Sequence, residues 1–171
     1  MKFYLFMPFC FLFGNCLSQS RFKEGSVKIK SDTFIVKRQD PGMKLGETPV
    51  IFVHSSKNKH VKLVHYTGKE LEISKNDIHI DRDAVRRIFF EVLKDKLTNL
   101  HKNEETISAS LTYLPSGVLT DVGYVFAENT MITPAEIEVI DNRIRSEIKA
   151  SFSGPTYKTN PVINIPIGFA F

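Results

Sequence analysis

The spacing of apolar residues changes in a fixed order along positions 81–171, and this order constrains the fold more than any other feature. From about residue 83 to residue 101, apolar residues recur with the 3.6-residue period of an α-helix. These residues are Val85, Ile88, Phe89, Val92, Leu93, Leu97 and Leu100. Residues 106–114 and 118–127 then alternate apolar and polar side chains, as strands with one buried face do. Pro115 and Gly117 lie between them, so a β-hairpin is predicted.

A second helix and a last strand follow the hairpin. Thr133 and Glu136 form the pattern of a capping box with Pro134 at the first helical position, which predicts a helix to about residue 150. Residues 161–171 alternate again. We therefore expect an α+β fold for residues 81–171, ordered helix, β-hairpin, helix, strand, with a three-stranded antiparallel sheet and helices on one face.

Residues 19–80 are predicted to form a β-rich N-terminal region. Two short strands are expected around Ser31 and Asp32, a third at residues 49–53, and a hairpin from residues 61–66 and 70–73. We divide the chain into residues 1–18, residues 19–80 and residues 81–171.

Residues 1–18 have the three parts of a secretory signal peptide. A basic Lys2 is followed by an apolar run and then by small and polar residues. Cleavage after Ser18 would leave Gln19 first, whereas cleavage before Cys16 would give a lipoprotein; an uncleaved anchor is a third, less favoured alternative. Both cysteines lie in this segment, so a chain cut after Ser18 has no thiol and relies on its core. We expect an exported protein that is periplasmic or associated with the outer membrane.

Residues 81–171 resemble the TonB/TolA C-terminal domain. The resemblance rests on the order of elements, Gly117 in the hairpin turn, the stretch from Leu119 to Val122 with its acidic Asp121, and Phe169 near the end of the last strand. It implies that domain fold and its mode of binding, but not energy transduction, because the inner-membrane helix and proline-rich spacer of that family are missing here. The phenylalanine-rich signal followed by Gln19 is similar in style to exported proteins of the Bacteroidetes.

The last strand is the predicted binding site. Pro166 confines this strand to a sheet edge or a bulge, where an extended peptide can add as a further strand. The residues expected to bind are Val162, Ile163, Asn164, Ile165, Ile167 and Phe169. Pro166 can equally blunt the edge against such pairing. We expect a non-enzymatic domain that binds a peptide or protein of the cell envelope.

Two alternatives stay open. Lys57, Lys59 and Lys62 form a basic stretch that could place a lipid-anchored structural protein against lipid or glycan, although a solvated segment is the simpler interpretation. The chain carries 23 basic and 19 acidic residues, and it has no stacking motif for nucleic acid, which we do not expect as a partner.

The other alternative is a metal-dependent hydrolase at residues 77–83. Asp77, His79 and Asp81 would share one face of a strand, but a second histidine is missing from this group and a solvated strand is favoured. The histidines are scattered and no nucleophile elbow, zinc-protease motif or phosphate loop occurs. We therefore expect no catalytic residue, no metal and no cofactor.

Overall fold

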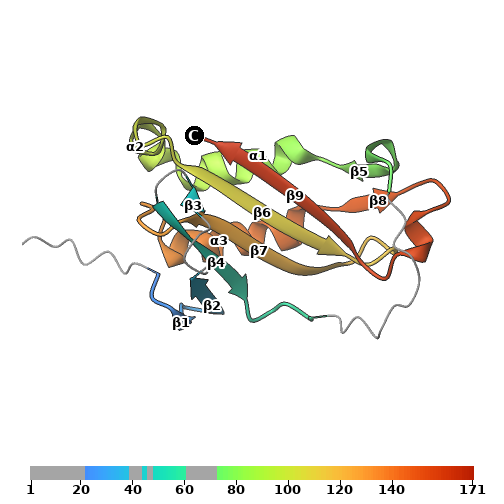
Figure 1. The fold of residues 1–171 in the computed structure, drawn as a ribbon, viewed down its shortest axis with the longest axis horizontal. Coiled ribbons are helices and arrows are strands. Elements are labelled where there is room, and N and C mark those ends of the chain that lie inside the picture. Colours follow the sequence, from blue (N-terminus) through green and yellow to red (C-terminus); the bar gives the residue numbers. More distant parts are fainter. Residues whose placement is uncertain (1–21, 39–43, 46–47, 61–72) are drawn as a thin grey trace, which may run out of the picture.

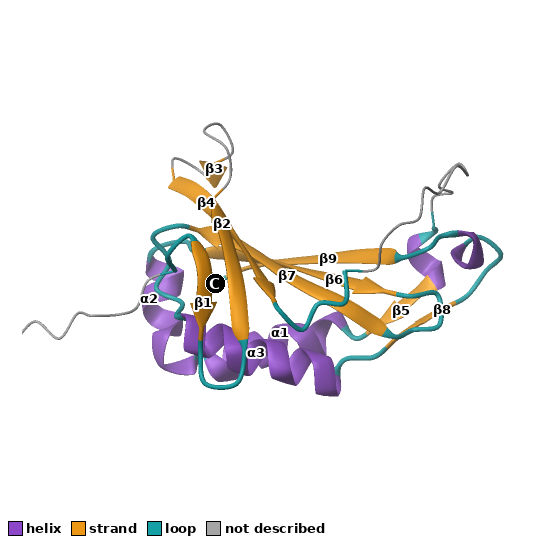
Figure 2. Ribbon diagram, turned by 90° about the horizontal axis from the view of Figure 1, so that it is seen from below, coloured by secondary structure: helices purple, strands orange, loops and turns teal. Residues whose placement is uncertain are grey.

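The computed structural model describes residues 22–38, 44–45, 48–60 and 73–171, which form a mixed α+β fold. Figure 2 shows the helices lying along one face of a twisted antiparallel sheet, while no helix of the described residues lies on the other face. The α+β class expected from the sequence is confirmed. The signal segment with Cys16, the residue Lys62 and residues 61–72 of the predicted hairpin lie outside the described residues.

The main sheet has strands from both parts of the chain (Figure 1). Its strands are β1 (Gly25–Lys28), β2 (Thr33–Arg38), β3 (Lys44–Leu45), β4 (Thr48–Ser55), β6 (Thr106–Tyr113), β7 (Leu119–Ala127) and β9 (Ile163–Ala170). Six of them follow the order β1-β2-β4-β7-β6-β9, and β3 pairs with β4 beside this path. Every pairing is antiparallel.

The expectation of a three-stranded sheet is wrong, because the sheet does not stop at β7. Strands β7, β6 and β9 are neighbours, but β4 pairs with the free side of β7 from Val50↔Ala127 to His54↔Gly123. Without β4, the outer backbone groups of β7 would have no ladder partner. Strands β2 and β1 extend the sheet further, and they form the predicted pair of strands around Ser31 and Asp32.

The first predicted helix is interrupted. Helix α1 (Arg82–Val92) ends at Leu93, a 3-10 turn occupies Lys94–Lys96, and α2 (Leu97–Lys102) follows. In this turn Lys96 Nζ donates to the Met131 carbonyl and to Glu136, both at 2.8 Å. The prediction of a continuous helix over residues 83–101 is therefore wrong. The break places Lys96 against the residues at the start of the helix predicted from Thr133 onward.

The second of the two predicted helices corresponds to α3 (Pro134–Glu147), which begins where the capping box predicts. The Glu136 N–H donates to Thr133 Oγ1 at 3.4 Å, and the Thr133 N–H donates to Glu136 Oε2 at 2.7 Å, so both halves of the capping box are present. Two short strands, β5 (Ile78–Ile80) and β8 (Ala150–Phe152), form a separate pair.

One hydrophobic core lies between the helices and the sheet. It includes Phe34 from β2, Val53 from β4, Phe89 from α1 and Tyr124 from β7, all of which are fully buried. The strands before residue 56 thus pack into the same core as the helices. In the described part of the chain, no helix has the length and apolar character needed to cross a membrane.

Candidate functional site

The helix-free face of the sheet carries short side chains in its centre. Because strand residues alternate between the two faces, the side chains opposite the core line up across five strands. One such row is Ile35, His54, Gly123, Ser110 and Pro166. Gly123 has no side chain and Ser110 has a short one, so the surface at the middle of this row lies closer to the sheet backbone than the surface at either end. The sheet is therefore hollowed on the face that the helices leave open.

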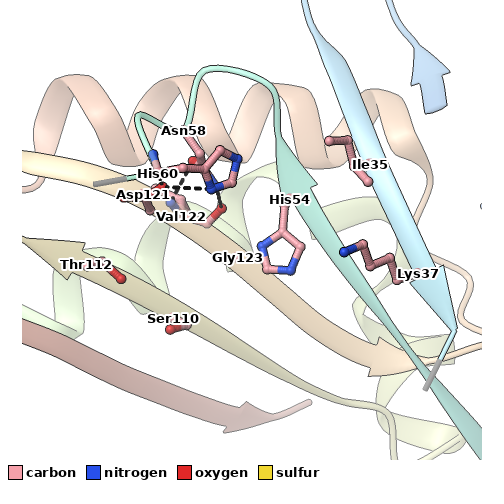
Figure 3. A pocket seen from close by; sticks show the side chains of 10 residues that line it. All are labelled: Ile35, Lys37, His54, Asn58, His60, Ser110, Thr112, Asp121, Val122 and Gly123. Atoms are coloured by element: carbon pink, nitrogen blue, oxygen red, sulfur yellow. Dashed lines mark hydrogen bonds and ion pairs between the residues drawn. The ribbon is translucent and has the colours of Figure 1, made fainter. Parts of the chain in front are cut away.

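This hollow has a volume of about 420 Å³. It is lined by Ile35 and Lys37 of β2, His54 of β4, Asn58 and His60 of the following loop, Ser110 and Thr112 of β6, and Asp121, Val122 and Gly123 of β7. Figure 3 shows the side chains of Lys37, His54, His60 and Ser110 around the same space. Most of these side chains come from paired strands, which hold their positions rigidly.

Gly123 lets the His54 ring lie against the sheet. A Cβ atom at Gly123 would lie 3.0 Å from His54 Nδ1 and 3.1 Å from His54 Cε1, which is closer than side chains usually approach. A glycine within a strand often marks such a close approach. The ring of His54 therefore occupies space that any other residue at position 123 would fill.

Among the described residues, one acidic side chain of the hollow has a close partner, whereas the lysine of the hollow has none. The His60 N–H donates to Asp121 Oδ1 at 3.0 Å, and the His60 ring Nδ1 lies 3.6 Å from the same oxygen. Lys37, by contrast, forms no ion pair with any residue that the structure describes. Partial burial lowers the pKa of His54, and the charges of Lys37 and His60 lower it further, against the opposite effect of Asp121. The His54 ring is thus mainly uncharged at neutral pH.

Asn58 connects the loop beside the hollow to the helix layer. Its amide donates to the Val122 carbonyl and its Oδ1 accepts from the Val122 N–H, both at 2.9 Å. Arg145 of α3 donates to the same Oδ1 at 2.5 Å and to the buried Asp141 at 2.8 Å. Because this asparagine is 8% exposed and bonded on both sides, it fixes the loop that carries His60.

Asp141 is enclosed between α3 and the sheet. Burial raises the pKa of this carboxyl, while hydrogen bonds from Arg145 and Tyr124 favour its charged form. The Tyr124 hydroxyl donates to Asp141 at 3.1 Å, and burial together with the adjacent carboxylate raises the pKa of Tyr124 well above its usual value. The group is a structural support for Asn58, since Arg145 joins Asp141 to Asn58 Oδ1 and none of Tyr124, Asp141 and Arg145 lines the hollow.

The predicted edge strand is found at one end of the sheet, as β9. Ile163, Ile165 and Ile167 face the core, while Asn164 is exposed. Phe169 is partly buried against Phe89 of α1, and Val162 precedes the strand. The side chains of the predicted site are therefore mostly part of the core, because this strand has its apolar face against α1.

The backbone of β9 is blocked at its centre. Pro166 has no N–H, and its carbonyl accepts a hydrogen bond from Arg82 Nη1 at 3.2 Å. Since backbone groups alternate along a strand, Asn164 and Gly168 direct their own groups to the same outer side as Pro166. A peptide adding to β9 would find donors and acceptors at these two residues and an occupied acceptor between them.

The predicted basic stretch is not one patch of free lysines. Lys57 Nζ donates to Asn142 Oδ1 at 2.7 Å and lies 3.3 Å from Asp32 Oδ2. Asp32 is buried and also accepts from Ser55. Lys59 is exposed. The lysine at position 57 is therefore paired with the buried Asp32 and with the exposed Asn142, which the sequence alone did not indicate.

The residues of the considered metal group have separate roles. Asp81 is the N-cap of α1 and accepts from the Ala84 N–H at 2.7 Å. His79 Nε2 lies 2.9 Å from Ser153 Oγ, which also contacts Asp77 at 3.3 Å. Among the described residues, no group of three or more histidine, cysteine or acidic side chains is arranged to hold a metal ion.

The sequence did not single out the residues of the hollow. His54 and His60 were two of several scattered histidines, and Lys37 was one of many lysines. The available signal was Gly123, a glycine within an alternating strand. Its significance depends on the pairing of β4 with β7, which brings His54 opposite Gly123.

Comparison with known proteins gives a likeness in fold. No protein-family model matches this chain, and no curated protein matches it. Among solved structures, a DUF5043 family protein from Bacteroides uniformis is similar, with a TM-score of 0.61 and 14% sequence identity. The likeness covers 87% of this chain and 85% of that chain. At this identity it supports the α+β fold alone, and the relationship to TonB/TolA domains stays a prediction.

Proposed function

We propose that this chain is a non-enzymatic binding protein and that its ligand occupies the hollow on the helix-free face. The observation that carries the proposal is the hollow itself, which is about 420 Å³ in volume and lies on a rigid sheet. Binding sites of small molecules are concave and have a few polar groups in fixed positions. The hydroxyls of Ser110 and Thr112 and the ring of His54 are groups of this kind.

The side chains that line the hollow favour binding over catalysis. Ser110 Oγ donates to Asn164 Oδ1 at 2.6 Å rather than to a histidine. Asp121 contacts the His60 backbone and ring, and His54 lies against Gly123. A serine or threonine nucleophile is activated by a base within hydrogen-bond reach, and the lining residues do not form such a pair.

Amide NMR with a panel of defined probes tests the proposal. The panel holds sulfate, oxalate, glucose, N-acetylglucosamine and the dipeptide alanyl-alanine. We expect at least one probe to shift the amide signals of Ser110, Thr112 and Gly123 with a saturating curve. If every probe leaves these signals unchanged, or shifts only residues on α1 and α3, the proposed site is wrong.

Addition of a peptide strand at β9 is the second candidate, because β9 ends the sheet along Ile163–Ala170. Hydrogen exchange with and without a bound peptide tests it. Strand addition would protect the Asn164 and Gly168 amides, and Arg82→Ala would strengthen it by freeing the Pro166 carbonyl. Unchanged exchange at both amides would leave the hollow as the preferred site.

We propose further that the protein is exported to the cell envelope, on the basis of its signal-like residues 1–18. Mass spectrometry of the mature N-terminus separates the alternatives. A chain that begins at Gln19 is free in the periplasm or secreted, and a diacylated Cys16 means a membrane-tethered lipoprotein. An intact Met1 would contradict both cleaved forms and leave the uncleaved anchor as the remaining alternative.

A further inference from the structure

Among the described residues that line the hollow, the ammonium group of Lys37 and the carboxylate of Asp121 form no ion pair with each other, so the two charges are separated. Lys37 has no ion-pair partner among the described residues, and the His54 ring lies beside it on the neighbouring strand. Asp121, the acidic residue of the lining, is already bonded by the His60 N–H. The unpaired positive charge of Lys37 therefore lies on the β2 side of the hollow, next to the His54 ring of β4.

Two hydroxyl groups of β6 line the other side of the hollow. Ser110 is opposite Gly123, and Thr112 is opposite Asp121, so both hydroxyls stand on the hollowed face. A carboxylate or a tetrahedral oxyanion accepts hydrogen bonds on several oxygens and binds best to a set of convergent donors. The Lys37 ammonium, a His54 ring N–H and the Thr112 hydroxyl provide that set here, and the Ser110 hydroxyl joins it when its proton turns from Asn164 Oδ1 to the anion.

From this geometry we infer that the ligand of the hollow carries an anionic group, a carboxylate or a tetrahedral oxyanion, which binds between Lys37, His54 and Ser110 and is taken up together with a proton on His54. The inference rests on the proposed function, because it concerns the same hollow. The rest of the ligand would extend over Ile35 on β2, which is 38% exposed and offers an apolar surface.

The uptake of a proton on anion binding is expected from the groups that surround His54. Among the described residues, the charged or titratable groups that face it are Lys37 of β2, His60 of the loop and Asp121 of β7, while β6 presents hydroxyls there. Burial and the two basic neighbours lower the pKa of the ring and favour its uncharged form at neutral pH. A bound anion would offset the positive charges and favour the imidazolium form, because an opposite charge raises the pKa of a histidine. The ring would take this proton from solvent, so acidification would strengthen binding.

Titrations with sulfate and oxalate test the inference. Both anions keep a constant charge from about pH 5.5 to 7.5, where histidine changes its own. We expect the dissociation constant of at least one to fall about threefold or more over this range of acidification. The pKa of His54, followed by its ring proton signals, should rise when that anion is bound. Sulfate alone would point to a tetrahedral oxyanion, and oxalate alone to a carboxylate.

Charge variants locate the site. Lys37→Met keeps the alkyl chain and removes the charge, and it should weaken anion binding about fivefold. Lys149→Met is the matched control, because it changes the net charge equally but lies after α3 and outside the hollow. Equal weakening by both variants would mean that the anion responds to net charge alone, and the inference would be overturned.

The outcomes separate this inference from the proposed function. If glucose or N-acetylglucosamine shifts the signals of Ser110 and Gly123 while neither anion does, the hollow is a binding site for a neutral ligand and the anion inference is wrong. If no probe shifts these signals, the proposed function fails as well. A fall in affinity on acidification would contradict the proton step even where an anion binds.

Discussion

Replacing Gly123 with alanine tests whether the His54 ring is held against the sheet. The new Cβ would lie 3.0 Å from His54 Nδ1, so the ring must move outward by a few tenths of an ångström or leave its rotamer. Burial is the main cause of the lowered pKa of His54. We therefore expect its pKa to rise toward the ordinary value of about 6.5 in Gly123→Ala.

Gly168→Ala is the matched control on the same face. A Cβ there has no atom within 4 Å, and Gly168 does not have a positive φ angle. Alanine in a strand interior is more stable than glycine by about 0.5–1 kcal/mol, so Gly168→Ala should gain that amount. In Gly123→Ala the displaced ring costs about 0.5–1.5 kcal/mol, which offsets the gain.

The two variants should therefore differ by about 1 kcal/mol in the free energy of unfolding, or roughly 2–4 °C in Tm for a chain of this size. Urea titration gives the first quantity and NMR titration of the histidine ring protons gives the pKa. If Gly123→Ala were as stable as Gly168→Ala and left the pKa of His54 unchanged, the close contact of ring and sheet would be refuted.

Further predictions concern the supports of the site and of the fold. Asn58→Ala should lower the free energy of unfolding by about 1–3 kcal/mol, measured in urea, because it leaves the Val122 backbone groups without partners. Burial raises the pKa of Asp32, but its hydrogen bonds and Lys57 outweigh burial and leave the pKa lowered. The stability this contributes is present above the unfolded pKa and is lost as pH falls through the folded one, so Asp32→Asn should weaken the protein at pH 7 and flatten its acid unfolding curve; an unchanged curve would contradict this. Thr133→Ala should cost about 1 kcal/mol by removing the N-cap of α3, and an unchanged Tm would contradict the role of the capping box.

The sequence predicted the elements whose signals are local. The capping box of Thr133 and Glu136 marked the start of α3, and alternation marked β6, β7 and β9. The break in the first helix was not predictable from apolar spacing, since Leu93 and Leu97 keep the helical period across it. Its support comes from the contact of Lys96 with Met131, which is distant in the sequence.

The extent of the sheet and the position of the hollow depend on contacts between distant segments. The pairing of β4 with β7 joins residues near position 50 to residues near position 125, and neither segment has a sequence signal that predicts its partner strand. His54 acquires its place only through this register, opposite Gly123. The predicted site at β9 had a local signal in Pro166, but the sequence could not show that Arg82 would reach the Pro166 carbonyl.

The central claim is that the helix-free face of the sheet binds a ligand. A crystal structure of the protein in complex with the tightest-binding probe of the panel tests it most directly. We predict density for the probe within hydrogen-bond distance of His54 and Ser110, with Lys37 turned toward it. Density for that probe only along the outer edge of β9, or only on the helix layer, would contradict the claim.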